Sequence, residues 1–200
     1  MGQAESLIAK GLSHQGYFNL EQAEDQRYEY LAGEVFAMVG GSEAHALIAM
    51  NTGAALSNIL RDRPCRVYGA DMKLYIAAAD KFCYLDVMVL CGEGGRGGNY
   101  VEAPVLIVEV LSDSTESYDR GLKFEHYRAI LDLRHYLLLS QHRLHAELYT
   151  RTDPSIWRFQ ETSGETGAVV LDAWGVKLPL VELYRNMELG GPESVPSSDK

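Results

Sequence analysis

The sequence predicts one mixed α/β domain, and three observations support that fold class. Apolar residues recur at helical spacing in some segments and alternate or run together in others, so helices and strands follow one another along the chain. No internal repeat or change of composition divides the 200 residues, of which 46% are hydrophobic and 23% charged. A chain of this size buries a core of its own. We therefore expect an N-terminal segment over 1–18, a single domain over 19–188 and a flexible tail over 189–200.

A helix and a short strand are predicted first. Asn19 is a plausible N-cap for a helix over residues 20–32, whose early acids suit the positive end of a helix dipole. Gly33 then ends this helix. Residues 34–39 alternate between two faces, which is the pattern of a short strand.

A longer helix follows over residues 43–62. Ser42 is its predicted N-cap, and Pro64 closes it. A set of apolar side chains at helical spacing is expected to face the core: Ala46, Leu47, Met50, Ala54 and Ile59.

Three strands are expected next, over residues 65–77, 83–91 and 104–112. The last two are apolar on both faces, which is typical of strands in the middle of a sheet that is covered on both sides. We therefore place these two at the centre of the sheet.

The C-terminal half completes the predicted sheet and adds to it. Asp119 is the expected cap of a third helix over 120–130, and a buried strand follows over 135–141. Residues 178–186 predict a closing helix with Pro179 near its first turn. Between them lie three segments that predict a more exposed antiparallel extension: 145–151, 156–163 and 168–175.

The charge balance limits the partners of the protein. It has 18 Lys and Arg against 28 Asp and Glu, which gives a formal net charge of −10. Attraction to phosphates scales with clustered cations, so a protein that coats polyanions in general is excluded. Any nucleic-acid site must be local.

Cysteine content and the N-terminus bear on the compartment. Cys65, Cys83 and Cys91 are odd in number and lack a Cys-x-x-Cys spacing, so we expect small core fillers rather than a disulfide framework or a zinc knuckle. The N-terminus has no basic segment followed by an apolar run, and no stretch reaches the roughly 18 apolar residues of a membrane span. We expect a cytoplasmic protein.

Two acidic residues interrupt the apolar pattern of the central strands. Asp86 lies within YLDVMVL and Glu109 within LIVEVL, where the pattern calls for aliphatic side chains. A carboxylate buried alone takes up a proton, pairs with a cation or binds a metal. On neighbouring strands both acids project to the same side at the same level, which forms an oxygen-ligand site suited to Mg²⁺ or Mn²⁺. For either acid alone, an ion pair or a wet strand end is the simpler explanation.

Three more residues are candidates for the same site. Lys123 follows Glu109 by 14 residues (123 − 109), which allows a helix to fold back and aim the ammonium at the acids. It is also explained as part of a solvated helix face. Glu34 is placed to reach the metal, and is equally explained as an exposed turn residue. His45, in a first helical turn, is interpreted as a capping or packing group rather than a catalyst.

The order of these motifs resembles the Uma-two family of putative restriction endonucleases, in the PD-(D/E)XK nuclease superfamily. The similarity runs from about Leu20 to Tyr184, and its strongest pieces are YLDVMV and APVLIVEVLSDSTESYDRGLKFEHY. The resemblance implies a restriction-endonuclease-like fold, with a central mixed sheet flanked by helices and an antiparallel β extension.

The resemblance also implies a role for each site residue. Asp86 corresponds to the Asp of the PD element and Glu109 to the (D/E) element, both as metal ligands, with the Val110 carbonyl as a further ligand. Glu34 corresponds to the acid that the superfamily often contributes from its first helix or the adjoining turn.

Two positions depart from the superfamily pattern. Leu111 stands where the lysine usually follows the acid, and the resemblance points to Lys123 as its replacement. Leu85 stands in place of the proline before Asp86.

The implied activity is metal-assisted hydrolysis of DNA phosphodiester bonds by a homodimer. Mg²⁺ or Mn²⁺ lowers the pKa of a bound water, and Lys123 orients that water or offsets charge on phosphorus. Basic residues around the rim are candidate phosphate contacts: Arg61, Arg63, Arg66, Lys73, Arg120 and Arg128.

Two other functions remain open at this point. A nuclease fold that has lost catalysis and binds DNA or protein accords with the net charge of −10 and the displaced lysine. A carboxylate-pair hydrolase of a sugar is the third reading, and it ranks last because the Tyr and Trp residues are dispersed.

Overall fold

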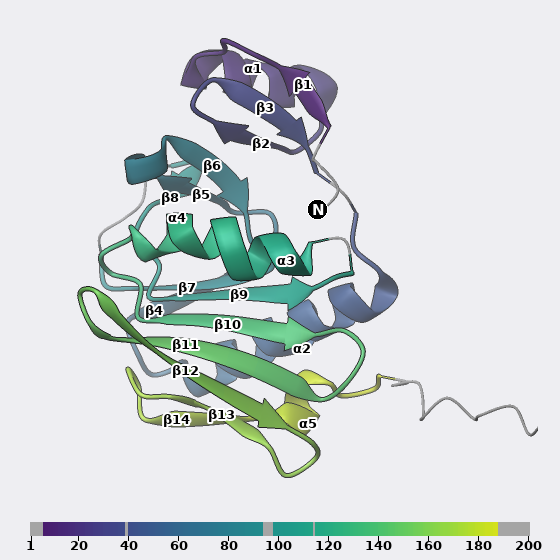
Figure 1. Ribbon diagram of the computed structural model, residues 1–200, viewed down its shortest axis with the longest axis vertical. Helices are drawn as coiled ribbons and strands as arrows, with labels where there is room; N and C mark the ends of the chain where they lie inside the picture. Colours follow the sequence, from purple (N-terminus) through teal and green to yellow (C-terminus); the bar gives the residue numbers. More distant parts are fainter. Residues whose placement is uncertain (1–5, 39, 94–97, 114, 188–200) are drawn as a thin grey trace, which may run out of the picture.

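The structure is a computed structural model that describes residues 6–38, 40–93, 98–113 and 115–187. Its described strands form two mixed six-stranded sheets and one two-stranded sheet (Figure 1). The mixed α/β class is confirmed, but the β-structure is divided between two large sheets instead of one central sheet. The first sheet has the order β1-β3-β2-β6-β5-β8, with strands Leu7–Ala9 (β1), Glu34–Ala37 (β3), Tyr28–Leu31 (β2), Lys81–Tyr84 (β6), Lys73–Ile76 (β5) and Tyr100–Val101 (β8).

The second sheet carries the core of the molecule. Its order is β12-β11-β10-β9-β7-β4, and β9 and β10 are its parallel pair. The strands are Ile156–Ser163 (β12), His145–Asp153 (β11), His135–Ser140 (β10), Leu106–Leu111 (β9), Val87–Cys91 (β7) and Cys65–Gly69 (β4). The two strands predicted at the centre, β7 and β9, are both interior, as their apolar character on both faces requires.

Helical elements lie on both faces of the second sheet (Figure 1). One face packs against α2 (Glu43–Ile59), α5 (Leu180–Leu183) and the hairpin of β13 (Ala168–Leu171) with β14 (Val176–Pro179). The other face packs against β5, β6 and α4 (Phe124–Arg128). α4 is the last part of a continuous helical segment that begins with α3 (Glu116–Tyr118) and continues through a π-helical turn (Asp119–Lys123). A 3₁₀ turn, Ala77–Ala79, joins β5 to β6.

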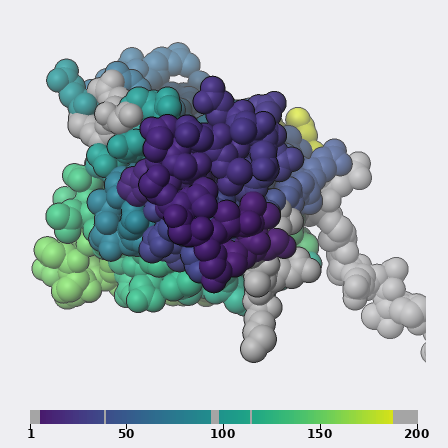
Figure 2. Space-filling view, turned by 90° about the horizontal axis from the view of Figure 1, so that it is seen from above, coloured from purple at the N-terminus to yellow at the C-terminus, as the bar shows by residue number. Residues whose placement is uncertain are grey.

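The N-terminal elements form an aromatic layer on the first sheet. The helix predicted over 20–32 is misplaced: α1 runs over His14–Glu24, so only residues 20–24 of the prediction are helical. Its N-cap is Ser13 and not Asn19, and it ends at Asp25, which adopts a left-handed conformation. The following residues form β2 because Tyr28 and Tyr30 bury their rings with Phe82 and the α1 side chain Tyr17. Segments from this region cover the end of the molecule seen in Figure 2.

Gly33 ends no helix and instead makes a tight turn. It lies with Ala32 between β2 and β3, and both residues have positive φ (92° and 46°). Two consecutive positive φ angles suit the right-handed twist of a two-residue hairpin. The predicted strand over 34–39 is observed as β3, and residue 39 lies outside the described residues.

The start of α2 is predicted correctly, but its core face is not. Ser42 caps the helix by accepting a hydrogen bond from the His45 N–H at 3.1 Å. The buried residues are Ile48, Asn51, Thr52 and Leu56. Of the predicted core residues, Ala46 and Ala54 are exposed and Met50 is 72% exposed, because they face a cleft.

Two predicted strands are each split between the two sheets. The segment 65–77 divides into β4 and β5, and the segment 83–91 belongs to β6 and β7. The chain crosses between the sheets at Leu85 and Asp86, so Asp86 is not a strand-interior residue. Hydrophobic runs alone do not mark such a crossing, because both halves are buried.

Cys65 and Cys91 form a disulfide, which corrects the expectation of three free cysteines. They are direct partners in the antiparallel register of β4 and β7. Their separation of 26 residues gives no sign of this contact, which the register creates. Cys83 is free and buried, as predicted.

The remaining predictions concern the C-terminal half and the ends. Helical structure begins at Glu116, ahead of Asp119, which therefore lies inside the segment and is not its cap. The strand over 135–141 and a short closing helix are observed. The predicted antiparallel extension is observed in part: β11 and β12 form the antiparallel end of the second sheet, but β11 is mostly buried and β13 pairs with β14 in a separate sheet. Within the described ranges, no helix is long and apolar enough to cross a membrane. The tail over 189–200 lies outside the described residues.

Candidate active site

Asp86 lies where the chain passes from β6 to β7. One of its carboxylate oxygens, Oδ2, accepts a hydrogen bond from the backbone N–H of Val110 at 2.6 Å. The same oxygen lies 3.2 Å from Nε2 of His45. The Asp86 side chain is 15% exposed, so it is held in place yet still reaches solvent.

Glu109 lies beside Asp86, in the middle of β9. Val87 pairs with Val108 in the antiparallel register of β7 and β9, which puts the next positions, Asp86 and Glu109, at the same level. The Glu109 side chain is only 5% exposed, and β7 and β10 flank its strand. The register thus puts Asp86 and Glu109 at one level of adjacent chain segments, although Asp86 lies just outside β7. Their shared role as metal ligands stays a prediction.

Lys123 reaches Glu109 from the helical segment that packs over β9. Its Nζ lies 3.2 Å from Oε1 of Glu109 and 2.9 Å from Oδ1 of Asp119. The side chain is 11% exposed. The predicted orientation of this helix over the strand is thus observed. The π-helical turn that holds Lys123 is a feature found often at functional sites.

Two residues of the cluster, Tyr127 and Asp119, are not assigned to it from the sequence, and His45 is a candidate there only as a capping or packing group. Tyr127, one helical turn after Lys123, donates its hydroxyl to Oε1 of Glu109 at 2.8 Å. Asp119 is buried beside Lys123 and accepts a hydrogen bond from Thr115 at 2.8 Å. The i, i+4 spacing of Asp119, Lys123 and Tyr127 was a signal that these residues share one helix face. His45 carried no comparable signal, because α2 is far from Asp86 in sequence.

The cluster contains more acidic than basic side chains, and it lies below a cleft. The pKa of Glu109 is raised to about 8, first by burial and also by the charges of Asp86 and Asp119, against the opposing effects of Lys123 and the Tyr127 hydroxyl. The hydrogen bond to Asp86 raises the pKa of His45, although burial lowers it. The single lysine does not fully compensate the acids, which is the condition under which carboxylates take up a cation.

A cleft of about 1210 Å³ opens over Asp86 and His45. Its wall includes the exposed side of α2, with Met50, Ala46 and Ala54. Acids outnumber bases around it: the charged residues of the lining are Glu21, Asp25, Asp71, Asp86 and Arg27. Asp86 is the point at which the buried cluster meets this cleft.

Glu34 is not brought into the cluster. It lies at the start of β3 in the first sheet, where its carboxylate pairs with Nζ of Lys10 at 2.8 Å. Its role as a metal ligand stays a prediction, as does the ligand role of the Val110 carbonyl.

Several of the predicted phosphate contacts are already engaged within the protein. Lys73 is buried and paired with Glu21. Arg120 pairs with Glu116 and Glu147, and Arg63 donates to the Trp174 carbonyl at 2.8 Å. Side chains held in this way are less available to a phosphate backbone than the sequence suggests.

Comparisons with known proteins agree with the motif resemblance. The family model Uma2, described as "Putative restriction endonuclease", matches residues 14–180. Two proteins of Synechocystis sp. (strain ATCC 27184 / PCC 6803 / Kazusa) are similar. "Uncharacterized protein slr1290" is 35% identical over 147 residues, 73% of this chain and 77% of that protein. "Uncharacterized protein sll1609" is 32% identical over 156 residues, 76% of this chain and 88% of that protein.

A solved structure shares the fold. It is the crystal structure of "a putative nuclease belonging to DUF820" from Anabaena variabilis ATCC 29413, with a TM-score of 0.64 and 12% sequence identity. The match covers 80% of this chain and 90% of that one. At this identity, the similarity establishes the fold alone.

Proposed function

Because the chain belongs to the Uma2 family, described as "Putative restriction endonuclease", we propose that it is a divalent-metal-dependent endonuclease that hydrolyses DNA phosphodiester bonds. The observation that carries the proposal is the meeting of Asp86 and Glu109 at one level of adjacent chain segments, below an open cleft. Lys123, 3.2 Å from Glu109, completes a set of groups suited to phosphate chemistry.

The residues fit a hard divalent cation. Asp86 and Glu109 offer carboxylate oxygens, the ligand type that Mg²⁺ and Mn²⁺ prefer, and the Val110 carbonyl is the proposed further ligand. Burial and the charges of Asp86 and Asp119 keep the pKa of Glu109 raised despite Lys123, and a bound cation would favour its ionised form. A bound Mg²⁺ or Mn²⁺ supplies a Lewis acid for a phosphate oxygen and lowers the pKa of a water ligand.

The other residues of the cluster hold these ligands and balance charge. The hydrogen bond from the Val110 N–H and the contact with His45 fix the orientation of the Asp86 carboxylate. The Tyr127 hydroxyl fixes Glu109. Lys123 is the cation that offsets negative charge on the phosphate or orients the attacking water, and Asp119 keeps its ammonium in position.

A plasmid-cleavage assay tests the proposal. With Mg²⁺ or Mn²⁺ present, wild-type protein is expected to nick or cut supercoiled plasmid, whereas Asp86→Ala and Glu109→Ala are expected to lose at least 100-fold in rate. Asp71→Asn is the matched control, since Asp71 lines the same cleft with a 98% exposed side chain. Glu34→Gln, in the same assay, tests the remaining predicted ligand. A cleavage rate that is unchanged without the metal and in Asp86→Ala would contradict the proposal.

A binding module without catalysis is the second candidate; the acidic lining of the cleft, which repels DNA phosphates, favours it over an active nuclease. Such a protein binds DNA or protein with unchanged affinity in Lys123→Ala and shows no turnover. The same plasmid assay, combined with a DNA-binding measurement on wild type and Lys123→Ala, separates the two candidates.

A further inference from the structure

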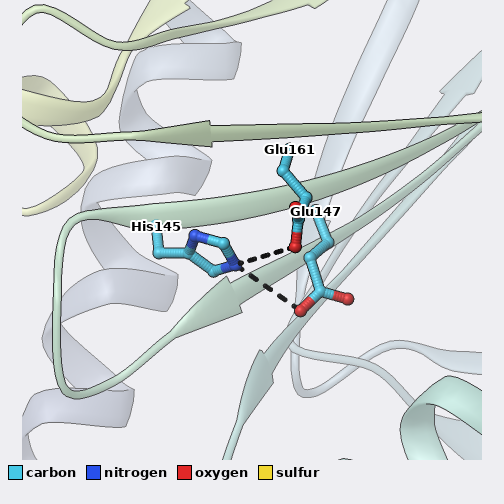
Figure 3. Close-up of side chains that lie close together, drawn as sticks. All are labelled: His145, Glu147 and Glu161. Carbon is cyan, nitrogen blue, oxygen red and sulfur yellow. Dashed lines mark ion pairs between the residues drawn. The ribbon is translucent and has the colours of Figure 1, made fainter.

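A second group of metal-binding side chains lies on the outer strands of the second sheet. His145 and Glu147 are two positions apart on β11 and so project from the same face. Glu161 lies on β12, directly opposite Glu147 in the register. Figure 3 shows the three side chains turned toward one another, and a ligand atom from each lies within 4.8 Å of the others.

The distances within this group are those of donors that share an ion. Nε2 of His145 lies 3.6 Å from Oε1 of Glu147 and 3.9 Å from Oε1 of Glu161 (Figure 3). Both are longer than a hydrogen bond. Two atoms that each bond one Zn²⁺ at about 2.0–2.2 Å are roughly 3.4–4.2 Å apart when the angle between them is tetrahedral or wider. The spacing therefore leaves room for one ion bound by all three atoms.

His145 is buried and pre-oriented for coordination. Its side chain is 7% exposed, and Nδ1 lies 2.8 Å from Oγ of Ser163, its partner position on β12. When the Nδ1–H donates to this hydroxyl, the lone pair of Nε2 is directed at the two carboxylates. Metal-binding histidines are held in this way by a hydrogen bond at the other ring nitrogen.

Glu147 is held in position by Arg120. Arg120 donates to both carboxylate oxygens, at 2.7 Å from Nη2 to Oε1 and 3.0 Å from Nε to Oε2. A carboxylate offers about four lone-pair positions, so Glu147 still has capacity for a metal.

Glu161 gives the group its excess negative charge. Like charges directly opposite on neighbouring strands destabilise a sheet. Glu147 and Glu161 hold such positions, and Glu161 is 59% exposed at the side chain, so it is accessible to an ion from solvent.

We propose that His145, Glu147 and Glu161 bind one transition-metal ion of the Zn²⁺ class, with a fourth coordination position open to water. One imidazole and two carboxylates match the donors that Zn²⁺ uses, and harder ions such as Mg²⁺ do not favour imidazole. The site is distinct from Asp86 and Glu109, because β10 lies between β9 and β11. It does not depend on nuclease activity.

Calorimetric titration of the Asp86→Asn protein with Zn²⁺ tests the site. The Asp86→Asn substitution is used because it minimises Zn²⁺ binding at the proposed nuclease centre. We expect one Zn²⁺ per chain, and Co²⁺ in its place is expected to give the visible absorption of a site with a nitrogen ligand. Glu161→Gln is expected to weaken Zn²⁺ binding at least 10-fold, and His145→Gln to abolish it. Glu165→Gln is the matched control, an exposed acid in the turn that follows β12.

The outcomes are separable from those of the nuclease proposal. Equal Zn²⁺ affinity in Glu161→Gln and Glu165→Gln, or no binding in the Asp86→Asn background, overturns the site. Glu161 is exposed, so its variant is expected to fold even where the buried His145 variant does not. Plasmid cleavage by wild type and Glu161→Gln at equal rates with Mg²⁺ leaves the nuclease proposal standing whatever the Zn²⁺ result.

Discussion

Glu109 lies in a strand whose other members are aliphatic, and its neighbours show how a carboxylate is accommodated there. Lys123 and Tyr127 contribute a charge and a hydroxyl, while Asp86 and Asp119 add negative charge. Asp86 and Glu109 could be predicted from the sequence because an acid in an apolar run is conspicuous, and Lys123 from its spacing after Glu109 and the family resemblance. Their catalytic roles stay predictions. The sequence did not identify His45 as a partner of Asp86, since that contact depends on how α2 packs.

Replacing Lys123 is expected to separate catalysis from metal binding. In Lys123→Met the ammonium beside Glu109 is lost, so cleavage falls at least 100-fold, whereas Mn²⁺ affinity is retained or rises because a competing cation is gone. Plasmid-cleavage rates and Mn²⁺ calorimetry on the same preparation check this. Unchanged cleavage in Lys123→Met would remove this residue from the mechanism.

His135 is expected to make the fold sensitive to acid. Burial lowers its pKa to about 4, and its Nε2 accepts the N–H of Ala173 at 3.2 Å, which requires the neutral ring. The folded pKa lies below the unfolded value, so this stabilisation is present above about pH 6.5 and is lost as pH falls toward 4, by up to roughly 3 kcal/mol.

Urea unfolding at pH 7 and pH 5 measures the effect. The loss of stability on acidification is expected to shrink in His135→Gln and to persist in His142→Gln, whose side chain is 64% exposed. Equal acid sensitivity in wild type and His135→Gln would contradict this role.

At the scale of single elements, the sequence predicts the end of a helix correctly where one capping residue determines it. Ser42 begins α2 because its hydroxyl satisfies a free N–H of the first turn. The core face of α2 was mistaken, since Met50 and its neighbours are apolar yet face the cleft. The segment of β2 is predicted as helix because the spacing of its tyrosines fits a helix as well as a strand. Packing of these tyrosines against Tyr17 and Phe82 favours the strand.

The disulfide between β4 and β7 is expected to stabilise this edge of the second sheet. It closes a loop with a sequence separation of 26, and cross-linking a loop of this length removes unfolded-state entropy worth roughly 3 kcal/mol. Cys65→Ser and Cys91→Ser are each expected to lower the urea midpoint of oxidised protein. Cys83→Ala is the control for the loss of a thiol. If reductant leaves the wild-type midpoint unchanged, this edge is stable without the bond.

At the scale of the whole molecule, two sheets meet at the crossing that carries Asp86. Crossings of this kind depend on long-range pairing, so the sequence predicted a mixed α/β domain and not its division into two sheets. For the proposed nuclease, the net charge of −10 and the acids of the cleft oppose DNA binding, and a bound divalent ion would offset part of that charge.

We propose a homodimer as the form that cuts both strands of a duplex, because one chain holds one Asp86 and Glu109 pair. Light scattering on the eluting protein is expected to give twice the chain mass of 22.2 kDa. A monomer at the concentrations used for cleavage, together with nicked plasmid as the sole product, would show that one chain acts alone.

The sharing of one divalent ion by Asp86 and Glu109 is tested most directly by calorimetric Mn²⁺ titration. All three proteins carry Glu161→Gln, so that the metal site proposed on β11 and β12 binds the least Mn²⁺. The first has no other change, the second adds Asp86→Asn, and the third adds the control Asp71→Asn at an exposed side chain. We expect one Mn²⁺ per chain, a loss of affinity of at least 10-fold in Asp86→Asn and no change in Asp71→Asn. Equal Mn²⁺ affinity in all three proteins would contradict a shared ion at these acids.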